Sequence, residues 1–272
     1  MRLFLTGLLI TVVGCNISPT ANTNVGRVNS PETSAPQDPP LVTMKVILTS
    51  PDGVRIVGSL YETFKQNSPA VLLLHQWQSD RHSYDDLAKQ MQSRGFNVLT
   101  IDGRGFGESV KTADGKNVSP SRTDEAVRGM LGDVATAFDF LAKQKNVNPN
   151  KIGIVGASYG SSLAIIYAAD NPKVAAVALL SPGLNYFGNM KTEPAVKKYG
   201  DHPLFLVAAE DDTESADAVR KLNPIQVDNP KYPEHIFNSG GHGTALLKVG
   251  AAEELGNFFA SVFDLSNLHV RP

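Results

Sequence analysis

The chain has 272 residues, of which 42% are hydrophobic and 19% are charged, and its formal net charge is -2. This composition is that of a globular protein, and without a concentrated excess of Lys and Arg it excludes a nucleic-acid-binding surface. The only cysteine, Cys15, cannot form an intrachain disulfide. With no second Cys and no close pair of histidines, we expect neither a metal site nor a cofactor.

The first 15 residues form a short apolar run that follows Arg2 and ends at Cys15. The run is too short to span a bilayer as a helix and has the shape of a secretory signal. Its last four residues, Val-Val-Gly-Cys, resemble a bacterial lipoprotein signal, with Val12 where Leu is usual. The resemblance implies cleavage before Cys15, lipidation of its thiol and anchoring in the cell envelope, with Asn16 favouring the outer membrane over another periplasm-facing surface. A buried first element containing Cys15 is the alternative.

The next segment, residues 16–41, is rich in Asn, Ser, Thr and Pro. Such a composition cannot bury enough apolar surface to offset the entropy of ordering, so we expect a disordered tether. A loop packed in part on the domain is the alternative. The folded domain is then expected over residues 42–264, with a short tail at 265–272.

Strands and helices alternate from residue 42 onward. We expect an antiparallel hairpin over 42–49 and 54–60, strands over 70–74, 97–101, 151–155, 174–180, 204–209 and 235–237, and helices over 80–94, 124–144, 159–169 and 243–261. An entry hairpin followed by this alternation predicts an α/β fold. Its sheet should be mostly parallel, with about eight strands and helices on both faces. Functional sites in such sheets lie at the carboxyl ends of the strands.

The strand at 151–155 is followed by Gly-Ala-Ser-Tyr-Gly, residues 156–160. A nucleophilic serine needs a sharp turn between strand and helix, where flanking glycines avoid side-chain clashes. The motif therefore predicts that Ser158 is a nucleophile at a helix N-terminus. A glycine-rich turn that only packs a helix against a strand is the alternative.

This motif and the segment Asp-Gly-Arg-Gly-Phe-Gly-Glu-Ser, residues 102–109, resemble those of the α/β-hydrolase superfamily. The resemblance covers residues 42–262 and implies the α/β-hydrolase fold and a serine hydrolase of the dienelactone-hydrolase or esterase type. We interpret residues 102–109 as a structural loop, in which the glycines permit positive φ and close approach, and not as catalytic residues.

A serine hydroxyl needs a base, and His242 lies in the Ser-Gly-Gly-His-Gly-Thr loop between the last strand and the last helix. The superfamily places its catalytic histidine in this position. The acid is expected directly after the strand at 204–209, where Glu210, Asp211 and Asp212 are candidates. The family pattern Gly-Glu-x-Asp aligns with residues 209–212 and favours Asp212, with Asp211 as its rival. The order Ser, Asp, His is that of the fold.

The oxyanion hole is expected after the strand at 70–74, where the family has His-Gly-x and this chain has His-Gln-Trp. By resemblance, its donors are the backbone amides of Trp77 and Tyr159. Gln76 stands where glycine is usual, so either its backbone avoids positive φ or the side chain tolerates that conformation at a cost. We interpret His75 as a structural hydrogen-bonding residue and not as a second base.

The segment at 181–202 has room for one short helix at most, so a minimal lid and an open pocket are expected. These features favour a carboxylesterase of the cell envelope that cleaves small-molecule esters with small or solvent-accessible acyl groups. An aminopeptidase or amidase is an alternative, for which Glu108, Glu193 and Glu210 are candidate amine-binding groups. A catalytically inactive envelope binding protein on the same scaffold is the other alternative. The oligomeric state is left open.

Overall fold

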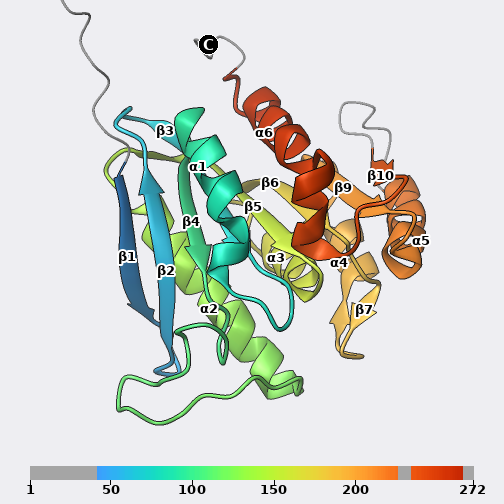
Figure 1. Cartoon of the computed structure of the whole chain (residues 1–272). Coiled ribbons are helices and arrows are strands. Elements are labelled where there is room, and N and C mark those ends of the chain that lie inside the picture. The colour runs from blue at the N-terminus through green and yellow to red at the C-terminus, as the bar shows by residue number, and fades with distance from the viewer. Residues whose placement is uncertain (1–41, 226–233, 266–272) are drawn as a thin grey trace, which may run out of the picture. The chain divides into compact units, whose positions relative to one another are not determined.

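The computed structural model describes residues 42–225 and 234–265 (Figure 1). The expected signal peptide with Cys15, the expected tether at 16–41 and residues 266–272 lie outside this part of the chain. Among the described helices, none is both long and apolar enough to cross a membrane.

An eight-stranded sheet forms the centre of the described domain, in the order β1-β2-β4-β3-β5-β6-β9-β10. The first two strands form the expected antiparallel hairpin, β2 is antiparallel to β4, and all the following neighbours are parallel. The predicted mostly parallel α/β-hydrolase sheet is therefore confirmed. The strands are β1 (Val42–Thr49), β2 (Arg55–Glu62), β3 (Ser68–Leu74), β4 (Asn97–Ile101), β5 (Val147–Ala157), β6 (Val174–Leu180), β9 (Leu204–Ala209) and β10 (His235–Phe237).

Helices cover both faces of this sheet, with α1 and α6 on one face and α2 and α3 on the other (Figure 1). Short 3-10 turns precede α1 and α6 and follow α5. The helices are α1 (Asp85–Ser93), α2 (Asp124–Ala142), α3 (Tyr159–Asp170), α4 (Thr192–Tyr199), α5 (Thr213–Leu222) and α6 (Ala251–Val262), and the turns are η1 (Arg81–Tyr84), η2 (Asn223–Ile225) and η3 (Gly243–Val249).

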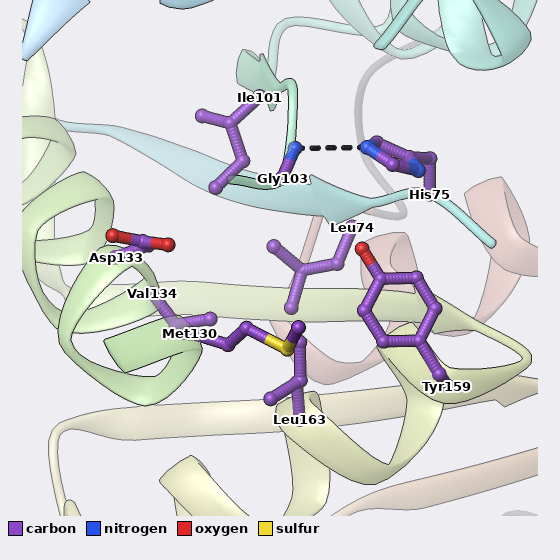
Figure 2. A pocket seen from close by; sticks show the side chains of 9 residues that line it. All are labelled: Leu74, His75, Ile101, Gly103, Met130, Asp133, Val134, Tyr159 and Leu163. Carbon is purple, nitrogen blue, oxygen red and sulfur yellow. Dashed lines mark hydrogen bonds between the residues drawn. The ribbon is translucent and has the colours of Figure 1, made fainter. Parts of the chain in front are cut away.

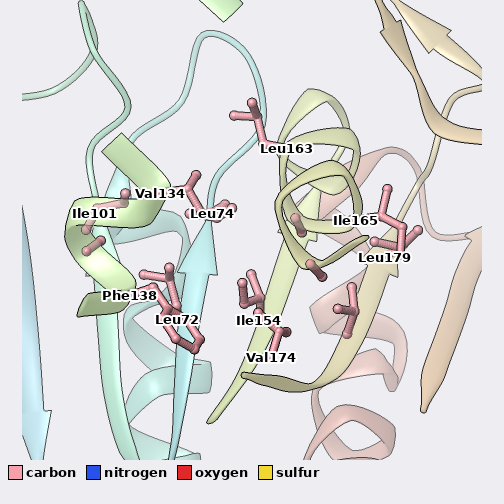
Figure 3. Close-up of a cluster of buried hydrophobic side chains, with 14 of the residues drawn as sticks. Leu72, Leu74, Ile101, Val134, Phe138, Ile154, Leu163, Ile165, Val174 and Leu179 are labelled. Carbon is pink, nitrogen blue, oxygen red and sulfur yellow. The ribbon is translucent and has the colours of Figure 1, made fainter. Parts of the chain in front are cut away.

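The core lies in two layers because successive side chains of a strand point to opposite faces. In β3, where every residue is buried, Leu72 and Leu74 pack with α2 and α3 in one cluster (Figure 3). The intervening Val71 and Leu73 pack with α1 and α6 in the other cluster. Burial on both faces explains why β3 has a continuous apolar sequence.

Two local differences from the expected elements have clear physical reasons. The helix expected over 243–261 is broken at Gly250, whose φ of 125° cannot continue a helix. The helix α5 was not expected, because its buried face consists mainly of small residues between charged ones. The segment 181–202 holds α4 and a two-stranded hairpin of β7 (Asn185–Tyr186) and β8 (Met190–Lys191), which is a minimal lid.

Candidate active site

Ser158 lies on a sharp turn between the end of β5 and the start of α3. Its backbone angles are φ 54° and ψ -125°, a strained combination for a residue with a side chain. The turn is held by the Ser158 amide, which donates to the Leu180 carbonyl at 2.9 Å. A β-carbon at Gly156 would lie 2.1 Å from the Gly160 carbonyl oxygen, so only glycine fits there. The motif thus raises the Ser158 hydroxyl above the end of the sheet, as its sequence predicts.

The structure brings Ser158, His242 and Asp212 into one hydrogen-bonded series. The Ser158 hydroxyl lies 2.7 Å from His242 Nε2, and His242 Nδ1 lies 2.7 Å from Asp212 Oδ2. The hydroxyl donates to Nε2 when Nδ1 carries the proton that it donates to the carboxylate. The side chain of Asp212 is 14% exposed and that of His242 is 44% exposed, so the acid is shielded beneath an accessible imidazole.

Asp211 makes different contacts from its neighbour Asp212. Its carboxylate accepts hydrogen bonds from the backbone amides of Gly240 and Gly241, at distances between 3.0 and 3.3 Å. These bonds favour the charged form and lower the pKa of Asp211. The geometry therefore separates the two acids: Asp212 contacts the His242 ring, while Asp211 holds the loop before it.

Gln76, the departure from the family pattern, has no positive φ; Gln78, two residues later, has φ 58°. The side-chain oxygen of Gln76 accepts a hydrogen bond from the backbone amide of Thr244 at 2.7 Å and another from the Thr244 hydroxyl at 2.9 Å. Gly243 has φ 64°, a conformation that favours glycine, and a β-carbon there would lie 2.3 Å from this oxygen. The backbone at Gln76 is unstrained, and its side chain contacts the loop that carries His242.

His75 is buried, and both of its ring nitrogens have protein partners. Nδ1 lies 2.7 Å from the Gln76 carbonyl oxygen, and Nε2 accepts from the Gly103 amide at 2.8 Å (Figure 2). Burial lowers the pKa of His75 and favours the neutral ring. These contacts give His75 a structural part, joining the loop after β3 to the loop after β4.

The other described histidines also have neighbours of their own. His82 pairs with Asp85 at 2.9 Å, and His235 pairs with Glu254 at 2.6 Å. Across the described ranges, no group of three or more His, Cys, Asp and Glu side chains could hold a metal ion.

The backbone amides of Trp77 and Tyr159 have no acceptor among the residues that the structure describes. Tyr159 is the first residue of α3, where an amide has no partner within the helix. Trp77 directly follows Gln76, and its ring centroid lies 5.4 Å from that of Tyr159. Both amides are thus unpaired within the described part of the chain, and unpaired amides are able to donate to an oxyanion.

Four aromatic side chains, Trp77, Phe106, Tyr159 and Phe187, contact one another and form an aromatic wall that includes the residue after Ser158. The Trp77 ring centroid lies 4.8 Å from those of both Phe106 and Phe187, in edge-to-face arrangements. The Arg122 guanidinium lies over the Trp77 and Phe187 rings, 4.8 and 4.9 Å from their centroids. Cation–π attraction thus joins the loop before α2 to the hairpin of β7 and β8.

A small pocket lies beside Tyr159 (Figure 2). Neither Ser158 nor His242 is among the residues that line it. The Tyr159 hydroxyl points toward Gly103, where a β-carbon would lie 2.6 Å from it. The lining residues are Leu74, His75, Ile101, Gly103, Met130, Asp133, Val134, Tyr159 and Leu163.

Two residues at the site were missed in the sequence. Ser181, directly after β6, has φ 47° and accepts from the Gly243 amide at 2.8 Å. Tyr186 donates its hydroxyl to the Ser181 carbonyl at 3.0 Å. Burial raises the pKa of Tyr186. The position of Ser181 at the carboxyl end of a parallel strand is the signal that could have indicated it.

Several solved structures of other proteins share the fold of this chain. An esterase from Pyrococcus furiosus superposes with a TM-score of 0.66 at 17% identity, covering 81% of this chain and 91% of the esterase. The α/β hydrolase GrgF from Penicillium gives 0.68 at 16% identity, covering 82% and 100%. A dienelactone hydrolase from Anabaena variabilis gives 0.62 at 18% identity, covering 82% and 97%. The chain is therefore an α/β hydrolase by fold.

The family model described as "Serine aminopeptidase, S33" matches residues 65–209, more than half of the chain, so the protein belongs to this hydrolase family. Among curated proteins, an uncharacterised protein of Mycobacterium tuberculosis is 31% identical over 138 residues, which are 50% of this chain and 44% of that protein. A polyketide transferase from Penicillium is 24% identical over 178 residues, covering 61% of this chain and 58% of the transferase. The chain thus spans less than two thirds of the length of these relatives.

Proposed function

We propose that this hydrolase is a serine carboxylesterase in which Ser158 is the nucleophile, His242 the general base and Asp212 the orienting acid. The observation that carries the proposal is the pair of 2.7 Å contacts, from the Ser158 hydroxyl to Nε2 and from Nδ1 to the Asp212 carboxylate. The three side chains come from the ends of different elements of the fold. Nucleophilic catalysis requires that they be aligned in this way, whereas a purely structural network does not.

The geometry supports an acyl-enzyme mechanism. His242 takes the hydroxyl proton as Ser158 attacks the ester carbonyl, and the Trp77 and Tyr159 amides stabilise the oxyanion. The intermediate collapses as the imidazolium gives its proton to the leaving alcohol. Water, deprotonated by His242, then hydrolyses the acyl-serine and regenerates the enzyme. Asp212 keeps the proton on Nδ1 and stabilises the imidazolium throughout without taking the proton itself.

The surroundings of the serine favour small acyl groups. Within the described residues, the segment in the position of a lid holds only the β7–β8 hairpin and α4, and the aromatic wall includes Tyr159, the residue after Ser158. Rings of this kind offer apolar contact to a short or flat acyl group at low entropic cost.

The experiment is fluorophosphonate labelling of the wild type and Ser158→Ala, read by intact mass, followed by a panel of short-chain 4-nitrophenyl esters. We expect one label on the wild type, none on the variant, and ester turnover by the wild type alone. An unlabelled, inactive wild type would instead support a binding protein on a hydrolase scaffold. A labelled variant would show that another serine is the nucleophile.

An aminopeptidase is the second candidate, because the matching family is described by that activity. A peptide amine would need a free carboxylate near the site, and all three expected candidates are paired with cations. Glu108 pairs with Lys45 and Arg81, Glu193 with Lys197 and Lys221, and Glu210 with Arg220. These pairings favour an ester over a peptide as the substrate. Parallel assays on an aminoacyl ester and its 4-nitroanilide test the choice, and faster anilide turnover would reverse it.

We also propose that the mature protein is anchored in the bacterial cell envelope through a lipid on Cys15, which rests on the sequence alone. Buried acyl chains would contribute about 0.8 kcal/mol per methylene to membrane binding. Expression with a labelled fatty acid should label the wild type and not Cys15→Ser, and the variant should leave the membrane fraction. Equal labelling of both proteins would refute the anchor.

A further inference from the structure

The loop of residues 240–244, which carries His242, is held by three acceptor side chains from elsewhere in the chain. Asp211 follows β9 and accepts from the amides of Gly240 and Gly241. Ser181 follows β6 and accepts from the Gly243 amide. Gln76 follows β3 and accepts from Thr244. The loop thus makes a hydrogen bond to the carboxyl end of each of three parallel strands.

The contact made by Gln76 caps a helix. The turn η3 starts at Gly243, and its N-cap residue, His242, makes no side-chain capping bond. First-turn amides need acceptors, and the Gln76 oxygen serves the Thr244 amide from 168 residues away in the sequence. The Thr244 hydroxyl donates to the same oxygen, so the orientation of the Gln76 carboxamide is set by two donors.

Gln76 also belongs to the segment that forms the other half of the site. Its carbonyl oxygen contacts the buried His75 ring, which in turn accepts from the Gly103 amide. The next amide along the chain is that of Trp77, one of the two amides proposed above as oxyanion donors. One residue therefore connects the oxyanion segment, through its backbone, with the His242 loop, through its side chain.

We propose that Gln76 is a positioning residue that fixes His242 relative to the oxyanion donors. This inference rests on the proposed esterase function. The Nε2 atom of His242 has to stay 2.7 Å from the serine while the ring gains and loses a proton. Almost half of the side-chain surface of His242 is exposed, so apart from its contacts with Asp212 and Ser158 the position of the ring depends on the loop that carries it. A glycine at position 76, as in the family pattern, could not make this contact.

The expected effect follows from the sensitivity of proton transfer to geometry. Misplacement of a catalytic group by about 1 Å can cost about 100-fold in rate, so removal of one of three supports should cost about 10-fold to 100-fold in kcat. Because Gln76 acts through His242, KM should change by less than about twofold.

The experiment compares ester hydrolysis and fluorophosphonate inactivation by the wild type, Gln76→Leu and Gln76→Glu, with melting temperatures recorded in parallel. The leucine variant removes the acceptor oxygen at similar volume, whereas the glutamate variant retains it. Gln144→Leu is the matched control. Gln144 is also partly buried and bonds a backbone carbonyl, that of Phe140, but it lies after α2 and just before β5 begins, at the opposite edge of the sheet.

We expect kcat of Gln76→Leu to fall by about 10-fold to 100-fold. We expect kcat of Gln76→Glu to stay within about threefold of the wild-type value, and kcat of Gln144→Leu to be unchanged. An active Gln76→Leu, or a Gln76→Glu as impaired as Gln76→Leu, would overturn the inference and leave the esterase proposal intact. A wild type that neither hydrolyses esters nor reacts with the probe would overturn both. If Gln76→Leu does not fold, Thr244→Val, which removes one donor to Gln76, should lower kcat at least about twofold, and unchanged activity would overturn the inference.

Discussion

Two glycine-rich loops border the site and are stabilised in different ways. The loop at 102–109 is built around buried charges: Asp102 pairs with Arg81, and Arg104 pairs with Asp133 on α2. The loop at 239–244 is held instead by its backbone amides, which donate to Asp211, Ser181 and Gln76.

Because of this difference, we expect the first loop to contribute mainly to stability and the second mainly to activity. A buried ion pair that loses one partner leaves an uncompensated charge in the interior, which is costly for folding. A loop held by hydrogen bonds of its backbone amides contributes less to folding, but it determines where the His242 ring lies. Changes in the first loop should therefore reduce stability, and changes in the second should reduce activity.

The largest expected effect is on activity and comes from Asp212, the carboxylate that contacts His242 in the second loop. Asp212→Asn should lower kcat by about 10⁴-fold, because the amide no longer fixes the proton on His242 Nδ1. Thermal unfolding should change little, which would sharpen the contrast between the loops. Kinetics on a 4-nitrophenyl ester measure the effect.

Asp211→Asn is the matched control, since it alters the neighbouring carboxylate, which accepts hydrogen bonds from the loop amides of Gly240 and Gly241. A loss of about tenfold is expected, by displacement of the loop. If Asp211→Asn were the more damaging of the two, the assignment of Asp212 as the acid would be wrong.

The next effect is on stability and arises in the first loop. Arg104→Met should lower the free energy of unfolding by about 3–5 kcal/mol, because Asp133 stays buried without its partner. Burial already raises the pKa of Asp133 against the opposing effect of Arg104. Urea denaturation gives the free energy, and kcat per folded molecule should be retained.

The control for this variant is Arg104→Met combined with Asp133→Leu, which removes both charges and should recover part of the loss. A single variant as stable as the wild type would mean that the pair contributes nothing, and the contrast between the two loops would fail.

The smallest expected effect is on the stability of the fold at low pH, and it involves Glu108 in the first loop. Hydrogen bonds from Lys45 and then from Arg81 lower the pKa of Glu108 from 4.5 to about 2. A carboxylate whose pKa is lowered by folding stabilises the fold above its unfolded pKa, and this contribution is lost as the pH falls through the folded pKa. The melting curves of the wild type and Glu108→Gln should therefore differ most above pH 4.5 and converge near pH 2. A difference that grows in acid would contradict this assignment.

The sequence predicted the strands well and the helices less well, for reasons visible in particular residues. The strand β3 is buried on both faces, and its continuous apolar run could be recognised without the fold. The helix α5 covers the sheet with Ala216, Ala218, Val219 and Leu222, a face too small to stand out in sequence. The end of η3 at Gly250 depends on a φ value that only the folded loop requires.

Within the site, the sequence by itself determined the chemistry that each segment can supply. The Gly-x-Ser-x-Gly turn raises Ser158, a local property that follows from backbone sterics. The superfamily resemblance assigns the proposed base to the last loop and the proposed acid to the loop after the preceding strand.

Only the tertiary structure decided which of Asp211 and Asp212 contacts the imidazole and what the unusual Gln76 does. The serine and the histidine are 84 residues apart, and Gln76 lies 168 residues from Thr244. Such contacts depend on the register of parallel strands that meet at one edge of the sheet. These contacts can form because the packed core on both faces of the sheet fixes those strands relative to one another.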